Sequence, residues 1–172
     1  MAKQLLAEAG YPNGFDTTLY AMSGFREKLA QIVQANLAEI GINVNIVVYE
    51  WATYLEGLSK GEAPMFFLGW TTNPLDADAG LYSTLHSSSR GSGGNYVMYS
   101  NPQLDAYLTI GRNNSDPKVR ADVYEQAQIH IYDEVPLVPL FYLYNNVATS
   151  KRVKEFKLNP FAYHELKYVV KD

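Results

Sequence analysis

The residues best suited to binding chemistry lie between positions 66 and 78. Gly69 leaves room for a ligand or a second backbone to approach closely, and Trp70 offers a flat apolar wall. Three neutral hydrogen-bonding side chains follow directly: Thr71, Thr72 and Asn73. Because an apolar run precedes them, we expect these residues just beyond the carboxyl end of a strand, where open α/β sheets bind ligands. A core tryptophan followed by a helix-capping loop explains the same pattern equally well.

Two carboxylates close this stretch and admit more than one chemistry. Asp76 and Asp78, together with Asn73, are oxygen ligands at a spacing that suits a hard cation. The favoured interpretation is a helix start before residues 77–85, where carboxylates offset unpaired amide groups. A small hydrolase that combines Asp76 or Asp78 with His86 is the rival from another class of protein.

Other catalytic motifs are absent from the sequence. It has no cysteine, which excludes disulfides, thiolate metal sites and cysteine nucleophiles. It has neither a P-loop nor a G-x-S-x-G nucleophile elbow, and His164-Glu165 lacks the second histidine of a helical zinc motif. The glycine-rich stretch 91–94 opens no helix, so we expect a flexible loop over 87–95 rather than a phosphate cradle. We therefore predict no catalytic residue, no bound metal and no cofactor.

The composition narrows the class of protein further. The chain has 172 residues, 47% of them hydrophobic and 19% charged, which suits one domain with a sizeable core. Its net charge of −4 comes without a basic stripe, so we expect no nucleic-acid partner. Its apolar runs are far shorter than the roughly 18 residues that suggest a membrane span.

Alternating periodicities predict the scaffold that positions these residues. Apolar side chains at helical spacing alternate with strand-like runs, and glycines or prolines mark the ends. The predicted order is a helix at 2–9, a strand at 16–22, a helix at 25–40, a strand at 42–48, a helix at 51–58 and a strand at 65–68. We expect the last strand to be central and covered on both faces. Further helices are expected to begin at Pro102 and Pro117, followed by an edge strand over 137–144. This order predicts an α/β layer with crossover helices.

Six blocks of the sequence resemble, in order, the oligopeptide- and dipeptide-binding proteins of ABC importers (family 5). They are AKQLLAEAGYPNGF at 2–15, QANLAEIGI at 34–42, GW at 69–70 with the Asp-rich loop after it, YSNPQLD at 99–105, Arg120 with YEQAQ at 124–128, and DEVPLVPL at 133–140. Each block alone is weak. Their order across nearly the whole chain makes the resemblance specific.

The resemblance implies an α/β fold in which a mixed sheet is flanked by helices, forming one lobe of a two-lobed, type II-like periplasmic-binding-protein fold. Residues 1–149 would form the C-terminal ligand-binding lobe, incomplete at its start. Residues 150–172 would form the segment that in the family returns to the first lobe. The chain is then expected to be a fragment of a longer protein, and its exposed apolar lobe face predicts dimerisation of the fragment.

The resemblance also implies a function. The protein would be the solute-binding component of an ABC importer, which captures peptides in a cleft between two lobes and delivers them to membrane permease subunits. It would be extracytoplasmic, either in the periplasm or anchored by lipid at the outer face of the cell membrane, and not an enzyme. Family members that bind nickel chelates, glutathione or oligosaccharides leave a non-peptide solute open. A receptor-interaction module is a further alternative.

The binding residues of the family carry over unevenly. The Gly-Trp segment lines the family's cleft, which implies that Gly69 and Trp70 contact the ligand. The best-understood peptide binders carry an Asp three residues after this Trp, paired with the peptide's amino terminus, whereas this chain has Asn73, which accepts a hydrogen bond without bringing a charge. Some members place a basic residue three before the Trp, where this chain has Phe67. Either Asp76 or Asp78 would compensate for the missing charge. The predicted ligand-binding residues are Gly69, Trp70, Thr71, Thr72, Asn73 and Asp76.

Overall fold

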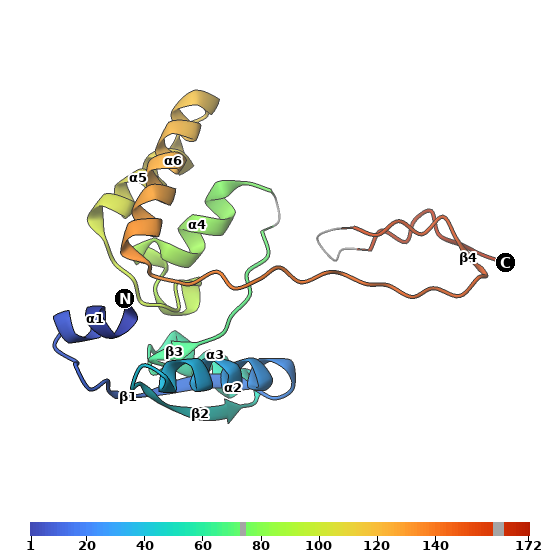
Figure 1. The fold of residues 1–172 in the computed structure, drawn as a ribbon. Helices are drawn as coiled ribbons and strands as arrows, with labels where there is room; N and C mark the ends of the chain where they lie inside the picture. Colours follow the sequence, from blue (N-terminus) through green and yellow to red (C-terminus); the bar gives the residue numbers. More distant parts are fainter. Residues whose placement is uncertain (73–74, 160–163) are drawn as a thin grey trace.

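The computed structural model of the chain describes residues 1–72, 75–159 and 164–172. After a short first helix, α1 (Ala2–Glu8), the elements form two regions and an arm (Figure 1). The sheet region comprises residues 16–66 and the helical region residues 75–135. The arm, residues 136–159 and 164–172, leaves the end of the helical region and contacts α2 through Phe141, and its far part extends away from both regions. The segment that follows the last strand of the sheet connects the two regions.

The sheet region contains three parallel strands in the order β2-β1-β3. The central strand β1 (Asp16–Met22) pairs with β2 (Asn43–Tyr49) along its whole length and with β3 (Met65–Phe66) at two positions. Helices α2 (Phe25–Ala38) and α3 (Trp51–Ser59) make the crossovers that parallel strands require. The predicted α/β architecture with crossover helices is confirmed.

A compact apolar core holds this region together. Alternate residues of β1, Leu19 and Ala21, face Ala30 of α2, and all three are almost fully buried. Gly14 leads into β1 with φ +78°, and a Cβ there would lie 1.9 Å from the carbonyl oxygen of Gly41. Only glycine allows the two turns to approach this closely.

The strand predicted over 65–68 differs from the expectation. The structure places β3 at the edge of the three-stranded sheet, limits it to Met65 and Phe66, and leaves both residues half-buried. The ladder ends because the hydroxyl of Tyr54 takes both backbone groups of Phe67: it accepts from the N–H at 3.1 Å and donates to the C=O at 2.6 Å. An apolar run does not by itself show which strands flank it, so its central position was a wrong prediction.

The helical region packs α4 (Ala77–Leu85), α5 (Pro102–Asn113) and α6 (Pro117–Glu134) around a second core. Both predicted proline starts are confirmed, and each is preceded by a side-chain cap, Asn101 for α5 and Asp116 for α6. The buried residues of this core are Leu85, Leu104, Leu108, Tyr124 and Ala127.

The 86–99 loop is more structured than its composition predicts. Two short 3-10 helices, Ser87–Ser89 and Gly91–Gly93, replace the expected flexible loop over 87–95. Asn95 then folds back into the region and is fully buried. The prediction failed because a glycine- and serine-rich composition does not reveal the buried side chains that order it.

The arm also departs from the prediction. The edge strand expected over 137–144 is absent, because residues 137–150 are described without strand pairing. Phe141 instead packs edge-on against Phe25 of α2, with ring centroids 5.6 Å apart. Beyond it, β4 (Val153–Lys154) and β5 (Val170–Lys171) form a small antiparallel ladder. The expected boundary near residue 150 stays a prediction.

Candidate functional site

The candidate site begins where the chain leaves β3. Tyr54, fully buried beneath this point, fixes Phe67 through the two hydrogen bonds described above. Burial raises the pKa of the Tyr54 hydroxyl, which keeps it protonated and able to donate to the Phe67 carbonyl. The residues that follow therefore leave the sheet from an anchored position.

Trp70 lies against the helical region and keeps about half of its surface open. Its Nε1 donates to the carbonyl oxygen of Ala79 in α4 at 3.2 Å. On the other side the 86–99 loop approaches so closely that a Cβ at Gly94 would lie 3.1 Å from Cη2 of Trp70. The side chain is nevertheless 48% exposed, which argues against a core tryptophan and leaves an apolar surface for a ligand.

The residues around Trp70 are distributed unevenly. A Cβ at Gly69 would have no described atom within 4 Å, so the space beside it is open. Thr71 is exposed, whereas the methyl group of Thr72 packs toward Gly80 in α4. Asn73 lies outside the described residues. A hollow of about 400 Å³ adjoins this segment and is lined by Thr72, Leu75, Asp76, Ala77, Gly80, Leu81 and Gln128.

Asp76 caps α4, as the favoured interpretation predicts. Its Oδ1 accepts from the backbone N–H of Asp78 at 2.8 Å. Nη2 of Arg120 contacts the two oxygens of Asp76 at 2.6 and 2.7 Å. The bond from the Asp78 N–H lowers the pKa of Asp76 below its usual value, and the contact with Arg120 lowers it further. These effects outweigh the partial loss of hydration, which raises the pKa. The carboxylate is therefore a helix cap and an ion-pair partner at once.

Asp78 is paired in the same manner. Its two oxygens accept from Nε and Nη2 of Arg112 in α5 at 2.8 and 2.9 Å. Both aspartates thus join α4 to its neighbouring helices instead of facing each other across a cation site. The described residues contain no group of three or more acidic or histidine side chains able to hold a metal. Sequence spacing identified the cap but contained no signal for either arginine partner.

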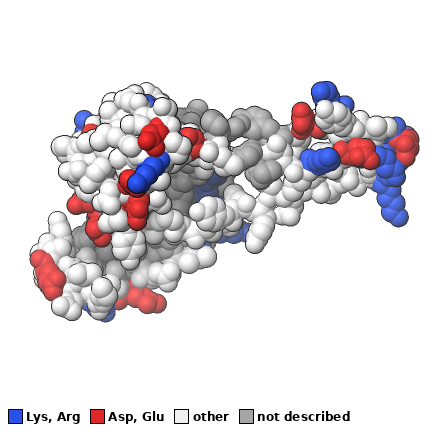
Figure 2. Space-filling model, turned by 90° about the horizontal axis from the view of Figure 1, so that it is seen from above, with Lys and Arg blue, Asp and Glu red and all other residues white. Residues whose placement is uncertain are grey.

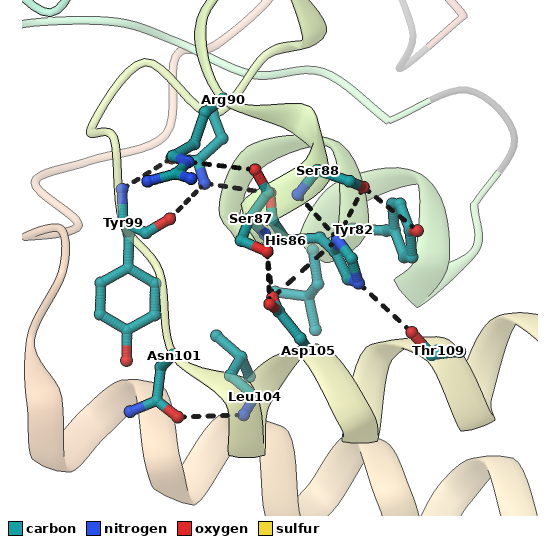
Figure 3. Close-up of polar contacts among 12 residues, drawn as sticks. Tyr82, His86, Ser87, Ser88, Arg90, Tyr99, Asn101, Leu104, Asp105 and Thr109 are labelled. Atoms are coloured by element: carbon teal, nitrogen blue, oxygen red, sulfur yellow. Dashed lines mark hydrogen bonds and ion pairs between the residues drawn. The ribbon is translucent and has the colours of Figure 1, made fainter.

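His86 lies at the opposite end of α4 from the two aspartates. Along the helix axis His86 lies about 12 Å from Asp78 and about 15 Å from Asp76 at 1.5 Å per residue, so the three side chains do not form a catalytic group. His86 is only 8% exposed. The structure surrounds it with Ser88, Thr109 and Asp105, a polar cluster that no sequence spacing indicated (Figure 3).

The cluster around His86 is not arranged as a nucleophile relay. Ser87 Oγ donates to Asp105 Oδ2 at 2.5 Å. His86 Nδ1 accepts from the backbone N–H of Ser88 at 3.1 Å and lies 2.8 Å from the Ser88 hydroxyl and 3.9 Å from Asp105 (Figure 3). A relay needs the imidazole between the hydroxyl and the carboxylate. Here Ser87 bonds to the carboxylate directly, which indicates a structural network.

Sequence comparison identifies the family. Residues 1–92, more than half of the chain, match the model of the bacterial extracellular solute-binding proteins, family 5, middle part. The chain belongs to this family. The matching residues include the sheet region and the segment around Trp70.

Individual relatives and solved structures agree. The chain is 35% identical over 168 residues to heme-binding protein A of Haemophilus influenzae, and 30% identical over 175 residues to the dipeptide-binding protein of Escherichia coli. These alignments cover 94% and 98% of the chain but only 30% and 32% of the relatives. The dipeptide-binding protein of Pseudoalteromonas sp. SM9913, solved with Met-Leu, superposes with a TM-score of 0.83 at 33% identity, covering 99% of this chain and 35% of that one. The chain thus spans about a third of the length of these relatives.

Two further observations concern the polarity of the helices and the charge on the surface. In the part of the chain that the structure describes, every helix is too short or too polar to cross a membrane. Acidic and basic side chains are interspersed on the face seen in Figure 2, and much of the surface between them is uncharged. This face carries no continuous basic patch of the kind that nucleic-acid binders use.

Proposed function

We propose that this chain is part of an extracytoplasmic solute-binding protein that captures a peptide or a related small solute and delivers it to the permease of an ABC importer. The observation that carries the proposal is the half-exposed indole of Trp70, held from two sides where the sheet region meets the helical region. A rigid, partly apolar surface with hydrogen-bonding neighbours is what small-solute sites require. Family membership supports the same conclusion.

The chemistry of the site favours neutral contacts. Gly69 leaves open space beside the segment, Thr71 is exposed, and Asn73 follows in the sequence. A carboxylate has about four acceptor positions, and Asp76 already uses three of them, one for the Asp78 N–H and two for Arg120. We therefore assign Asp76 the weaker role of accepting one hydrogen bond from the ligand. Its charge is largely balanced by Arg120.

A peptide fits these features because it offers apolar side chains for Trp70 and backbone groups for neutral hydrogen bonds. The relative from Pseudoalteromonas was solved with Met-Leu, and another relative, 34% identical, is a glutathione-binding protein of Salmonella paratyphi A. The remainder of the full-length protein would supply the opposing lobe. Closure of the two lobes on the solute would then shift the protein toward its closed state.

The test is calorimetric titration of the full-length protein with Met-Leu. Trp70→Ala is expected to weaken binding more than tenfold, about 1.4 kcal/mol or more, because the apolar wall is removed. Trp51→Phe is the matched control: Trp51 is equally exposed but lies on α3, and a phenylalanine keeps a ring against Tyr54. Unchanged affinity in a folded Trp70→Ala variant would remove Trp70 from the site.

A further inference from the structure

The position of Trp70 depends on the 86–99 loop. Gly94 faces the indole so closely that a Cβ there would lie 3.1 Å from Cη2, and it also lies against the carbonyl oxygen of Ser83. Because neither neighbour leaves room for a side chain, a displacement of Gly94 changes the surface on which Trp70 rests. The bonds that hold this loop therefore bear on the ligand site.

Asn95 connects Gly94 to the start of the loop. Its backbone N–H donates to the carbonyl of Ser89 at 2.9 Å, and its Nδ2 donates to the carbonyls of His86 and Tyr99 at 3.1 and 2.9 Å. Its Oδ1 accepts from the N–H of Tyr99 at 3.2 Å. With its side chain fully buried and these bonds formed, Asn95 transmits the position of residues 86–89 to Gly94.

His86 holds the beginning of the loop through its imidazole. Nδ1 accepts from the backbone N–H of Ser88 at 3.1 Å, and this bond caps the first 3-10 helix. Nδ1 also lies 2.8 Å from the Ser88 hydroxyl. Nε2 lies 3.3 Å from the hydroxyl of Thr109. A backbone N–H can only donate, so Nδ1 must be unprotonated and the proton of the neutral ring sits on Nε2.

Charged groups face this imidazole from two helices. On α5, Asp105 lies 3.9 Å from Nδ1, but its oxygens already accept from the N–H and hydroxyl of Ser87 at 2.9 and 2.5 Å. On α4, the ring of Tyr82 stacks on the imidazole at 4.0 Å. The guanidinium of Arg112 covers the Tyr82 ring at 3.3 Å and is itself paired with Asp78.

Within the loop, the remaining charged neighbour is Arg90, whose Nε donates to the carbonyl of Ser87 at 3.2 Å (Figure 3). The imidazole thus has one carboxylate within reach and cationic groups nearby. Its bond to Ser88 requires the neutral ring, whereas a protonated ring would be drawn toward Asp105.

We propose that His86 is a positioning residue for Trp70 and that proton uptake by its imidazole rearranges the loop and lowers solute affinity. Protonated Nδ1 faces the Ser88 N–H as a second donor, so the cap breaks. The imidazolium then turns to Asp105, and the Ser87 bonds to that carboxylate must adjust. The first 3-10 helix carries this change through the Ser89 carbonyl and Asn95 to Gly94. The inference rests on the proposed function, because it gives the ligand site a dependence on pH.

The first experiment needs no ligand. In a Trp51→Phe background Trp70 is the sole tryptophan of the 172-residue chain, so its emission reports its own surroundings. We expect the emission maximum to shift between pH 7.5 and pH 5.5, an interval in which imidazoles acquire their proton. His86→Asn should abolish the shift, because asparagine caps the helix well and does not titrate there.

His130→Asn is the matched control. His130 also touches the loop, since its Nε2 lies 3.2 Å from the Tyr99 hydroxyl, but it does not bond to residues 86–95. This variant should keep the pH-dependent shift. A shift that persists in His86→Asn, a shift lost in His130→Asn, or no shift in the parent chain would each overturn the proposal. Circular dichroism at both pH values checks that each variant is folded.

The second experiment links the loop to binding. In the full-length protein, affinity for Met-Leu is expected to fall about fivefold or more from pH 7.5 to pH 5.5, and His86→Asn should show no such fall. If the affinity depends on pH equally in the parent and in His86→Asn, the proposed role of His86 is refuted, while the proposed peptide site is not affected. Absence of Met-Leu binding at both pH values would contradict the proposed peptide site, while the Trp70 emission would still test the loop.

Discussion

The sheet region and the helical region each have a largely apolar core, but different kinds of interaction join their elements. In the sheet region, strands pair through their backbones, and the buried side chains of its core are apolar. In the helical region, side-chain pairs join the elements: Asp76 to Arg120, Asp78 to Arg112, Ser87 to Asp105, and His86 to Thr109. Trp70 lies between them, leaving the sheet from an anchored strand but resting on the polar-bonded helices.

This difference indicates which region can respond to its surroundings. Backbone ladders and apolar contacts carry no titratable group, so mild changes of pH leave them intact. Side-chain bonds such as those of Asp76 and His86 depend on protonation and on single residues. We therefore expect changes at the ligand site to come from the helical side, while the sheet side provides a constant support.

The largest expected effects come from truncating the two cores. Leu19→Ala and Leu108→Ala each remove a fully buried side chain and should each lower the free energy of unfolding by about 3 kcal/mol. Hydrogen exchange should rise mainly in β1 and β2 for Leu19→Ala, and mainly in α5 and α6 for Leu108→Ala. An equal rise of hydrogen exchange in both regions for either variant would show that the two regions unfold as one unit, which would contradict the distinction drawn between them.

Two helix glycines give the next effect. A Cβ at Gly111 of α5 would lie 2.6 Å from Cζ of the buried Tyr124, so Gly111→Ala should lower stability by about 2 kcal/mol through overpacking. At Gly57 of α3 the nearest atom is a ring carbon of the half-buried Tyr20 at 3.2 Å, and alanine favours helix. Gly57→Ala should stay within about 0.5 kcal/mol of the parent. Urea unfolding measures the stability of both variants. Equal losses of stability would contradict the expectation that the packing around Gly111 is tighter than that around Gly57.

The smallest effect concerns the cap of α4. Asp76→Ala removes both cap and ion pair and should cost about 1 kcal/mol. Asp76→Asn keeps a capping oxygen and should cost about 0.5 kcal/mol. Because bonding lowers the pKa of Asp76 in the folded chain, its stabilisation is present above about pH 4 and lost as the pH falls below that value. The difference in free energy of unfolding between the parent and Asp76→Asn should therefore shrink from pH 7 to pH 3. A difference that stays constant over this range would contradict a contribution from the ion pair.

Local signals in the sequence predicted many of the elements. The helical spacing of α2, the alternation in β2 and the proline starts of α5 and α6 all appear in the structure near the expected residues. The cap at Asp76 was predicted for the same reason, since a cap acts on amides two residues away. The position of the 65–68 run was not predictable in this way, because edge and centre differ only in what packs beside a strand.

The candidate site divides along the same line. By itself the sequence determined the family, the order of the elements and the residue types available at Gly69–Asp76, because periodicity, caps and motif order are properties of neighbouring positions. Only the tertiary structure decided that Trp70 rests between Ala79 and Gly94. It also decided that Asp76 pairs with Arg120, 44 residues further along the chain, and that His86 lies within hydrogen-bonding distance of Thr109, 23 residues further along. These contacts exist because packed helices and strands bring distant residues within bonding distance, and no local pattern in the sequence encodes that approach.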